Sequence, residues 1–358
     1  MKPNINKHDI EFLIECLKSG KEIPEVYKYA LFPTKQKEYE LVYAGKMRKE
    51  DVLADTEEAK PVPLQIEKVF NGKKYPLYSK DWHNLLVFGD NLQILKTFNE
   101  NKDPLIKNKV KGRVKLIYID PPFGTGDEYD GNKGQSAYSA KKKGADFVEF
   151  LRRRLILLHE VLSDDGIIFV KIDYHFGHYI KIILDEVFGK NNFRNEITVN
   201  RIKKNVTQQG RQSIPTATDS IFLYFKSEHS NLVNVFKRLT EEKAGYWHAM
   251  DSAGIRRPRE RVFFGKTMLP PDERHFSFTQ DRIDRMINEG KIRLNPSNSK
   301  PEYWIEPKSE MALDTNWTDI PGYSFTTGYP TENSERIYQA ILLLQDIRLK
   351  IRKRHYIE

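Results

Sequence analysis

An aspartate followed by two prolines and an aromatic ring carries the most specific chemistry in the sequence. The residues are Asp120, Pro121, Pro122 and Phe123, and they come directly after the apolar run 116–119. A carboxylate and a rigidly held proline carbonyl only accept hydrogen bonds, so together they suit an amino group. The ring of Phe123 offers a flat apolar face beside them. These residues predict a pocket for a nucleobase with an exocyclic amine, and a base that starts in a duplex must be flipped out to reach it.

The four residues also allow a purely structural interpretation, in which Asp120 caps the next segment and Phe123 packs in the core. Adenine and cytosine both carry an exocyclic amine, so the pocket chemistry does not choose between them. Planar amines of RNA or protein are a third, weaker alternative.

The surrounding elements predict an α/β fold that would position this site. Residues 116–119 are short, apolar and β-branched, which predicts a buried strand that the prolines end. An open α/β sheet binds its ligands at the carboxyl ends of its strands. The other expected strands are 84–88, 167–172, 195–200 and 220–225, and the expected helices are 92–98, 147–162 and 176–188. This alternation predicts a mainly parallel sheet.

Five segments, in this order, resemble the Mod-type (type III-like) site-specific DNA methyltransferases of the β class, which methylate adenine. They are Phe-Gly-Asp-Asn-Leu at 88–92, Ile-Tyr-Ile-Asp-Pro-Pro-Phe at 117–123, Leu-Ser-Asp-Asp-Gly-Ile-Ile-Phe-Val at 162–170, Ile-Leu-Asp-Glu-Val-Phe-Gly at 183–189 and Thr-Gly-Tyr-Pro-Thr at 327–331. The resemblance implies a Rossmann-like methyltransferase sheet with helices on both faces and an inserted target-recognition region.

The resemblance also implies roles for individual residues. Asp120 and the Pro121 carbonyl would hold the target amine, with Pro122 keeping the loop rigid and Phe123 stacking on the flipped base. S-adenosylmethionine would be the methyl donor, and the cofactor-binding residues expected here are Asp90 and Asn91. Implied partners are double-stranded DNA, a helicase-nuclease restriction subunit and a second copy of the chain in a homodimer.

The cofactor's glycine motif is missing from the sequence. No Phe-x-Gly-x-Gly occurs, and the residues after Thr331 are Glu-Asn-Ser where the family usually has Gln-Lys-Pro. Without the glycines the backbone has no close approach to the cofactor. We therefore expect a C-terminally truncated DNA adenine methyltransferase, and the sequence does not decide whether this chain alone is active. The alternative is a non-catalytic DNA-binding remnant or subunit of a modification complex.

Two basic segments are candidates for DNA contact. The polar loop 124–144 contains Lys141, Lys142 and Lys143, which suit backbone phosphates; a flexible surface loop is the alternative. Between residues 201 and 319 the α/β pattern is lost, and Arg256, Arg257 and Arg259 lie in this expected target-recognition region. An ordinary arginine-rich surface would look the same. The consecutive arginines 152–154 are expected on a solvated face of their helix.

Length and composition agree with a DNA-binding enzyme and fix the expected domains. The 358 residues carry a net charge of +9 and a pI near 9.2, which suits a polyanionic partner. The lone Cys16 excludes an internal disulfide and a cysteine-based metal cluster, and no metal site is expected. No signal peptide or membrane-length apolar run is present, so we expect a cytoplasmic protein. The expected domains are 1–80 (accessory), 81–226 (catalytic), 227–325 (target recognition) and 326–358 (start of the cofactor part).

Overall fold

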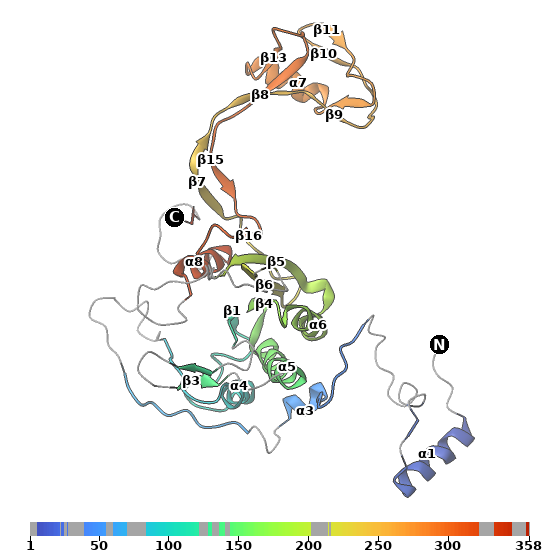
Figure 1. The fold of residues 1–358 in the computed structure, drawn as a ribbon, viewed down its shortest axis with the longest axis vertical. Coiled ribbons are helices and arrows are strands. Elements are labelled where there is room, and N and C mark those ends of the chain that lie inside the picture. Colours follow the sequence, from blue (N-terminus) through green and yellow to red (C-terminus); the bar gives the residue numbers. More distant parts are fainter. Residues whose placement is uncertain are drawn as a thin grey trace. The chain divides into compact units, whose positions relative to one another are not determined.

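The computed structural model divides the chain into two compact units, Met1–Asn231 and Leu232–Glu358, each drawn as part of Figure 1. The structure describes residues 6–21, 23–24, 27, 39–54, 60–69, 84–121, 128–130, 136–139, 144–201, 214, 216–321, 333–345 and 356–357. Five of the predicted site residues lie outside the described ranges: Pro122, Phe123, Lys141, Lys142 and Lys143.

Unit 1 contains an α/β sheet whose strands run in the order β1-β4-β6-β5. The strands are β1 (Val114–Ile119), β4 (Leu162–Ile172), β5 (Phe193–Asn200) and β6 (Thr218–Phe225). The helices of the unit are α1 (Lys7–Ser19), α3 (Lys49–Leu53), α4 (Asn91–Glu100), α5 (Gly144–Val161), α6 (Gly177–Phe188) and the 3₁₀ turn η1 (Lys190–Asn192). Two short strands, β2 (Glu128–Asp130) and β3 (Ser136–Ser139), pair within the segment that the sequence predicted as a loop.

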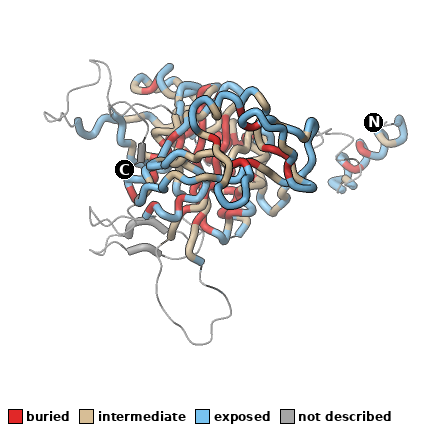
Figure 2. Tube along the Cα trace, turned by 90° about the horizontal axis from the view of Figure 1, so that it is seen from above, coloured by how far each residue is buried: buried red, intermediate tan, exposed pale blue. Residues whose placement is uncertain are grey.

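One face of this sheet is covered by α5 and α6. Alternate side chains of β4, namely Ile168, Val170 and Ile172, join Leu151 and Leu155 of α5 in one buried cluster. Because side chains alternate along a strand, these residues define the helix-covered face. The same cluster contains Ile180, Ile183 and Leu184 of α6 and Phe222 and Tyr224 of β6. In Figure 2 the buried residues, coloured red, gather in the body that holds these elements.

The sheet is α/β, as predicted, but the expectation of a mainly parallel sheet was wrong. Among the described strand pairs of this sheet, β1–β4 is parallel, whereas β4–β6 and β5–β6 are antiparallel. Parallel neighbours need a crossover, usually a helix, between them. The sequence between residues 200 and 218 has no helical pattern, so β6 returns beside β5 in the opposite direction.

The predicted strand at residues 84–88 is also absent. These residues form no strand, and the side chains of Leu86 and Phe88 are 97% and 100% exposed. Apolar, β-rich composition predicts a strand only where a neighbour can pair with it, since an isolated strand leaves its backbone groups unpaired. No strand among the described residues pairs with this segment.

Unit 2 contains a three-stranded arm and a small lobe. The arm pairs β7 (Phe236–Lys243) with β15 (Lys308–Ala312) and with β17 (Tyr356–Ile357). The lobe lies between them in the sequence (Figure 1) and comprises β8 (Tyr246–Ala249), β9 (Asp251–Ala253), β10 (Arg261–Phe263), β11 (Lys266–Met268), β12 (Arg274–Phe276), α7 (Gln280–Asn288), β13 (Ile292–Leu294) and β14 (Pro301–Ile305). The remaining elements are β16 (Asn316–Trp317) and α8 (Glu335–Leu344).

The lobe has its own core, built from Met250, Phe263, Phe276, Ile283 and Ile292.

Among the helices that the structure describes in either unit, none is long and apolar enough to cross a membrane.

Candidate functional site

Asp120 stands at the carboxyl end of β1, beside a fully buried lysine of β4. Ile119 pairs with Val170, so the next step of the parallel ladder brings Asp120 next to Lys171. The Nζ of Lys171 donates to Oδ2 of Asp120 at 3.2 Å, with the lysine side chain 0% and the aspartate side chain 22% exposed. A buried charge is tolerated only when it is paired, and this contact therefore fixes the orientation of the Asp120 carboxylate.

Lys171 belongs to the sheet face opposite α5 and α6. Its neighbours Val170 and Ile172 belong to the helix-covered cluster, and alternation turns Lys171 the other way. In the antiparallel ladder Ile172 pairs with Ser220, so the following step sets Asp173 opposite Asp219. The carboxyl ends of β1 and β4 and the amino end of β6 thus meet at one edge, with their charged side chains on one face.

Asp219 is a buried acidic residue at the same edge. Burial raises the pKa of its carboxyl, the positive charges of Arg201 and Lys171 oppose that shift, and the carboxylates of Asp173 and Asp120 add to it. Its Oδ1 lies 3.6 Å from Nη1 of Arg201. Among the described residues, neither buried carboxylate oxygen of Asp219 has a hydrogen-bond partner. Ionisable groups perturbed in this way occur preferentially at functional sites.

Asp173 links the edge to the surface. Its side chain is 0% exposed, and its Oδ2 lies 2.6 Å from Nδ1 of His175, whose side chain is 45% exposed. The other oxygen, Oδ1, is buried and has no hydrogen-bond partner among the residues that the structure describes. Together with Asp120, Lys171, Arg201 and Asp219, this pair forms what we call the strand-end cluster.

Asp90 and Asn91, the predicted cofactor-binding residues, have structural roles at the start of α4. Asp90 caps the helix, because its Oδ1 accepts from the backbone N–H groups of Leu92 at 2.8 Å and Gln93 at 3.2 Å. The Oδ1 of Asn91 accepts from Nε of Arg154 at 2.6 Å. Burial lowers the pKa of Arg154 to about 10 against the favourable charge of Asp90. These contacts fasten α4 to α5.

The described residues do not fit S-adenosylmethionine as a complete site. Asp90 uses its Oδ1 for the helix cap, and Asn91 uses its Oδ1 for Arg154. Gly89, with φ +149, is the one glycine beside them, and a Cβ there would meet the side chain of Ile94 at 3.4 Å. One glycine followed by a capping aspartate is not the glycine-rich turn that lets a backbone approach a nucleotide cofactor closely.

Arg152 and Arg154 of α5 are buried, contrary to the expected solvated face, whereas Arg153 between them is partly exposed. Arg152 is 3% and Arg154 8% exposed. Arg152 donates through Nε at 3.0 Å and Nη2 at 2.8 Å to Glu186 of α6. Such charge-assisted contacts are the strong class of side-chain hydrogen bonds, and they join the two helices that support the sheet.

The three predicted DNA-binding arginines that are described lie between β9 and β10 in unit 2. Arg256 and Arg257 are exposed, whereas Arg259 is half-buried and its Nη2 donates to the carbonyl of Pro271 at 3.3 Å. The Nη2 of Arg259 also lies 3.8 Å from Oδ1 of Asp272. Arg256 and Arg257 are therefore open to solvent, and Arg259 braces the loop that carries them.

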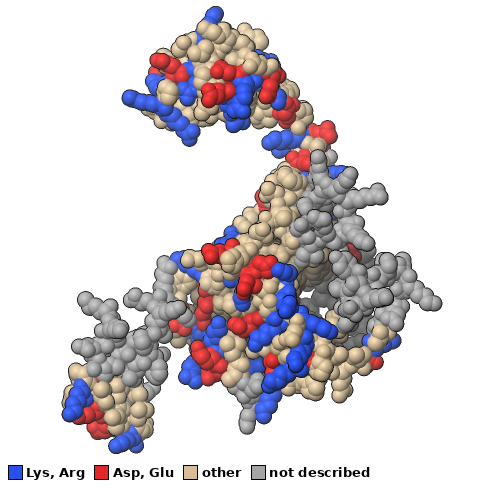
Figure 3. All heavy atoms as spheres, turned by 180° about the vertical axis from the view of Figure 1, so that it is seen from behind, with Lys and Arg blue, Asp and Glu red and all other residues tan. Residues whose placement is uncertain are grey.

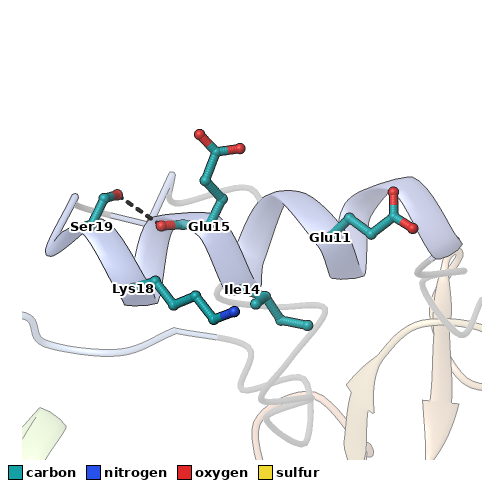
Figure 4. A pocket seen from close by; sticks show the side chains of 5 residues that line it. All are labelled: Glu11, Ile14, Glu15, Lys18 and Ser19. Carbon is teal, nitrogen blue, oxygen red and sulfur yellow. Dashed lines mark hydrogen bonds between the residues drawn. The ribbon is translucent and has the colours of Figure 1, made fainter.

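A shallow hollow on α1 is a weaker candidate. It is lined by Glu11, Ile14, Glu15, Lys18 and Ser19, and Figure 4 shows all five side chains on this single helix. The hydroxyl of Ser19 donates to the carbonyl of Glu15 at 2.7 Å, a bond within the helix. Residues three and four apart are neighbours on the surface of any helix, so this hollow is an ordinary helix surface.

The sequence reasoning named Asp120 but missed the rest of the strand-end cluster. The available signal was the pattern Ile-Ile-Phe-Val-Lys-Ile-Asp at 167–173, in which charged residues interrupt an apolar strand at its carboxyl end. Charged residues are almost never fully buried unless paired, so Lys171 called for an acidic neighbour. Only the strand order and register identify that neighbour as Asp120.

The chain matches a family model described as DNA methylase, over residues 114–344. The type II methyltransferase M.EcaI of Enterobacter cloacae is 29% identical over 266 residues, covering 68% of this chain and 58% of the relative. A HindVI Mod subunit, named as part of a type III restriction-modification enzyme of Haemophilus influenzae, is 33% identical over 269 residues, covering 75% of this chain and 31% of the relative. The chain thus spans less than two thirds of either relative.

Two solved structures also resemble parts of the chain. A complex of M1.HpyAVI with SAM has a TM-score of 0.27 and 19% identity, covering 44% of this chain and 60% of that one. The cytosine-N4-specific PvuII DNA methyltransferase has a TM-score of 0.27 and 14% identity, covering 40% and 50%. Superpositions this partial do not define a shared architecture.

Proposed function

Because the chain belongs to the DNA methylase family, whose model covers the sheet, the strand-end cluster and most of unit 2, we propose that it provides the base-holding part of a DNA adenine methyltransferase. The reaction would transfer a methyl group from S-adenosylmethionine, the methyl donor of this family, to the exocyclic amine of adenine. The observation that supports the proposal is the buried ion pair between Lys171 and Asp120.

The ion pair gives Asp120 the properties that an amine acceptor needs. Lys171 holds the Asp120 side chain in place, and an ionised carboxylate accepts hydrogen bonds without donating any. The carbonyl of Pro121, the next residue, is a second acceptor held by a fixed ring. Two acceptors on one amine favour its tetrahedral geometry and expose the nitrogen lone pair. In this proposal Pro122 and Phe123, outside the described residues, limit the pocket and stack on the base.

No covalent bond to the protein is required by this arrangement. Asp120 binds and orients the amine, and the proton that the methylated nitrogen loses can pass to the carboxylate or to water. The part of the site that meets the methyl donor does not fit within the described residues, so we derive no step through it.

A non-catalytic role is the second candidate, and a specific observation favours it. The Oδ1 atoms of Asp90 and Asn91 accept hydrogen bonds in the α4 cap and from Arg154, so both residues already have a structural role. In that case the chain would bind DNA as one subunit of a modification complex. Double-stranded DNA, a restriction subunit with helicase and nuclease activity, and a homodimer are the partners that we propose for either role.

Calorimetric titration with S-adenosylmethionine, alone and then with duplex DNA, separates the two candidates. Saturable donor binding, followed by transfer of tritiated methyl groups to duplex DNA, is expected for the methyltransferase. Salt-dependent DNA binding without donor binding would instead support the non-catalytic role. Absence of both would contradict the proposal as a whole.

The base specificity is tested with duplexes that lack one kind of target amine. Replacing adenine by purine, which has no exocyclic amine, should abolish tritium incorporation if adenine is methylated. Incorporation that survives this change and is lost on replacing cytosine by a pyrimidone without the amine would assign the cytosine amine instead. RNA and peptide competitors should leave the rate on duplex DNA unchanged.

A further inference from the structure

An exposed phenylalanine stands at the tip of the hairpin formed by β10 and β11 in the lobe of unit 2. Phe263 pairs with Lys266, so Phe264 and Gly265 are the two turn residues. Both have positive φ, +51 for Phe264 and +78 for Gly265. Positive φ at both positions identifies the tight turn whose twist matches paired strands. Asn and Gly normally occupy its first position, and a bulky ring there is a genuine outlier.

The ring of Phe264 is exposed to solvent and is not buried in the lobe core. The side chain of Phe264 is 50% exposed, whereas its neighbour Phe263 is 0% exposed and packs in the lobe core. The ring of Phe263 meets that of Phe276 edge-on, with 5.0 Å between centroids. One ring therefore anchors the hairpin while the next projects from it. Strained backbone that survives in a folded protein is a reason to look for a function.

The side chains of Gln280 and Arg261 hold the base of the hairpin to the rest of the lobe. Gln280 of α7 accepts from the backbone N–H of Val262 at 2.8 Å and donates to the Val262 carbonyl at 2.9 Å. The guanidinium of Arg261 donates to the carbonyls of Phe278, Pro258 and Glu260 at 3.1, 2.8 and 2.7 Å. These five bonds fix the base of the hairpin to the lobe, so the tip is a rigid projection.

Exposed basic side chains accompany this projection. Lys266 follows the turn directly, and Arg256 and Arg257 belong to the loop that leads into β10; all three are exposed. Lys and Arg of the lobe are visible as blue spheres at the top of Figure 3, interspersed with acidic residues. Positive charges beside a rigid apolar tip match duplex DNA, which offers phosphates outside and stacked apolar faces inside.

We propose that Phe264 is a wedge that enters the base stack of duplex DNA while Lys266 and the neighbouring arginines bind the phosphates. The ring would separate two base pairs and locally untwist the helix, as apolar wedges do in other DNA-binding proteins. This inference deepens the proposed function, since a base that must leave the stack is released more easily where the stack is already broken. It goes beyond electrostatic binding because it assigns a mechanical role to one side chain.

DNA untwisting is measurable without knowing the recognised sequence. The full chain is mixed with a closed circular plasmid, which presents many sequences, and topoisomerase I is added to relax it. After removal of protein, the linking number reports the untwisting. We expect the parent protein to lower the linking number and the Phe264→Ala variant to leave it as in protein-free DNA. Phe264→Trp should keep the effect, because tryptophan retains a stacking ring.

Leu269→Ala is the matched control, because Leu269 is an apolar residue of the same lobe that is 61% exposed, against 50% for Phe264. It should untwist DNA like the parent. Fluorescence anisotropy on a labelled duplex runs in parallel, and Phe264→Ala should weaken binding about 5- to 100-fold, the range for loss of one stacked ring.

Each failure has its own meaning. If the parent binds DNA but does not change the linking number, the wedge is contradicted while the proposed function stands. The same conclusion follows if Phe264→Ala untwists DNA as well as the parent does. If Phe264→Ala leaves DNA binding intact but converts a dimer to a monomer in sedimentation, the tip is a protein contact and the proposal is wrong. Complete absence of DNA binding by the parent would overturn the wedge together with the proposed function.

Discussion

At the scale of single residues, Lys171 fixes the position of the Asp120 carboxylate. Its ammonium is 0% exposed and pairs with a carboxylate that is partly open to solvent. Removing one partner of a buried pair leaves an uncompensated charge, which is strongly destabilising. The pair is therefore a positioning device, because the carboxylate cannot swing away from the lysine without that penalty. A ligand amine meets Asp120 already in place.

We expect Lys171→Met to lower kcat for methyl transfer about 10- to 100-fold, since small displacements of a binding group have effects of this size. KM for DNA should change little, because Lys171 is buried and touches no DNA. Initial rates with tritiated S-adenosylmethionine measure both constants. Lys115→Met is the control, since Lys115 lies on β1, the strand that leads to Asp120, but its side chain is 59% exposed and pairs with Asp165. Equal losses in the two variants would contradict a positioning role for Lys171.

Asp219 should make the protein less stable at high pH. Burial raises the pKa of its carboxyl in the folded state, so the folded chain binds more protons than the unfolded chain between the two pKa values. Stability therefore falls as the pH rises through that interval, and the loss is complete above the folded pKa. Asp219→Asn removes the charge and should raise the unfolding free energy at pH 8 by about 1 kcal/mol, the scale for a buried polar group without partners.

The measurement is thermal unfolding of parent and variant at pH 4.5 and pH 8, and the advantage of Asp219→Asn should be larger at pH 8. Asp165→Asn is a control of opposite sign, because a hydrogen bond from Lys115, with another from Ser163, lowers the pKa of that carboxyl. Its loss should destabilise the protein slightly at pH 8. A gain for Asp219→Asn that is the same at both pH values would show that the charge is not the cause.

At the scale of elements, the sequence identified the pieces but not their neighbours. The apolar periodicities located α5, β4, α6 and β6 to within a few residues, because burial alone dictates those patterns. The partner of Lys171 and the pairing of Asp173 with Asp219 depend on strand order and register, which no local pattern encodes. The segment 84–88 shows the converse, since its composition predicts a strand but no described strand pairs with it.

Gly166 is required where β4 approaches β1. A Cβ at this position would lie 2.8 Å from Cδ2 of Leu162 and 2.9 Å from the carbonyl oxygens of Ser163 and Val114. Two of these contacts are backbone atoms that cannot move without disturbing the ladder. We expect Gly166→Ala to lower the unfolding free energy by about 1–3 kcal/mol, as overpacking does.

Urea unfolding of Gly166→Ala and Gly177→Ala tests this directly. Gly177 begins α6, and a Cβ there would meet only Ile172, at an ordinary 3.8 Å. That variant should be as stable as the parent or slightly more so, since alanine favours a helix. A Gly166→Ala protein with parental stability would mean that β1 and β4 are not in contact at this position.

Gln280 should control the rigidity of the β10–β11 hairpin. Its amide makes both backbone bonds to Val262, and Gln280→Leu removes them while keeping side-chain volume. Loss of about 1 kcal/mol of hydrogen bonding would speed exchange of the Val262 amide about 5- to 10-fold. Hydrogen–deuterium exchange measures this, with Asp281→Asn on the same helix as the control. Unchanged protection at Val262 would mean that another contact holds the strand.

At the scale of the whole molecule, the two units divide the chemistry between them. Unit 1 contains the strand-end cluster, and unit 2 contains the exposed Arg256, Arg257 and Lys266 with the apolar tip. The net charge of +9 is distributed over both. Affinity for DNA should therefore depend strongly on salt, because each phosphate contact releases counterions. Chemistry at Asp120 should not share that dependence once the DNA is saturating.

This division predicts how a double arginine variant behaves. Arg256→Ala combined with Arg257→Ala removes two exposed cations, so the slope of log Kd against log salt should become shallower by about 2 if each arginine meets one phosphate. Anisotropy titrations at several salt concentrations give the slope. Lys18→Ala combined with Arg48→Ala is the matched control, since both cations lie in unit 1 and outside the loop between β9 and β10, and Arg48 already pairs with Asp51 at 2.8 Å. A control slope that changes as much as the arginine variant's would mean that DNA meets the general positive field of the protein and that the loop between β9 and β10 has no special part in binding.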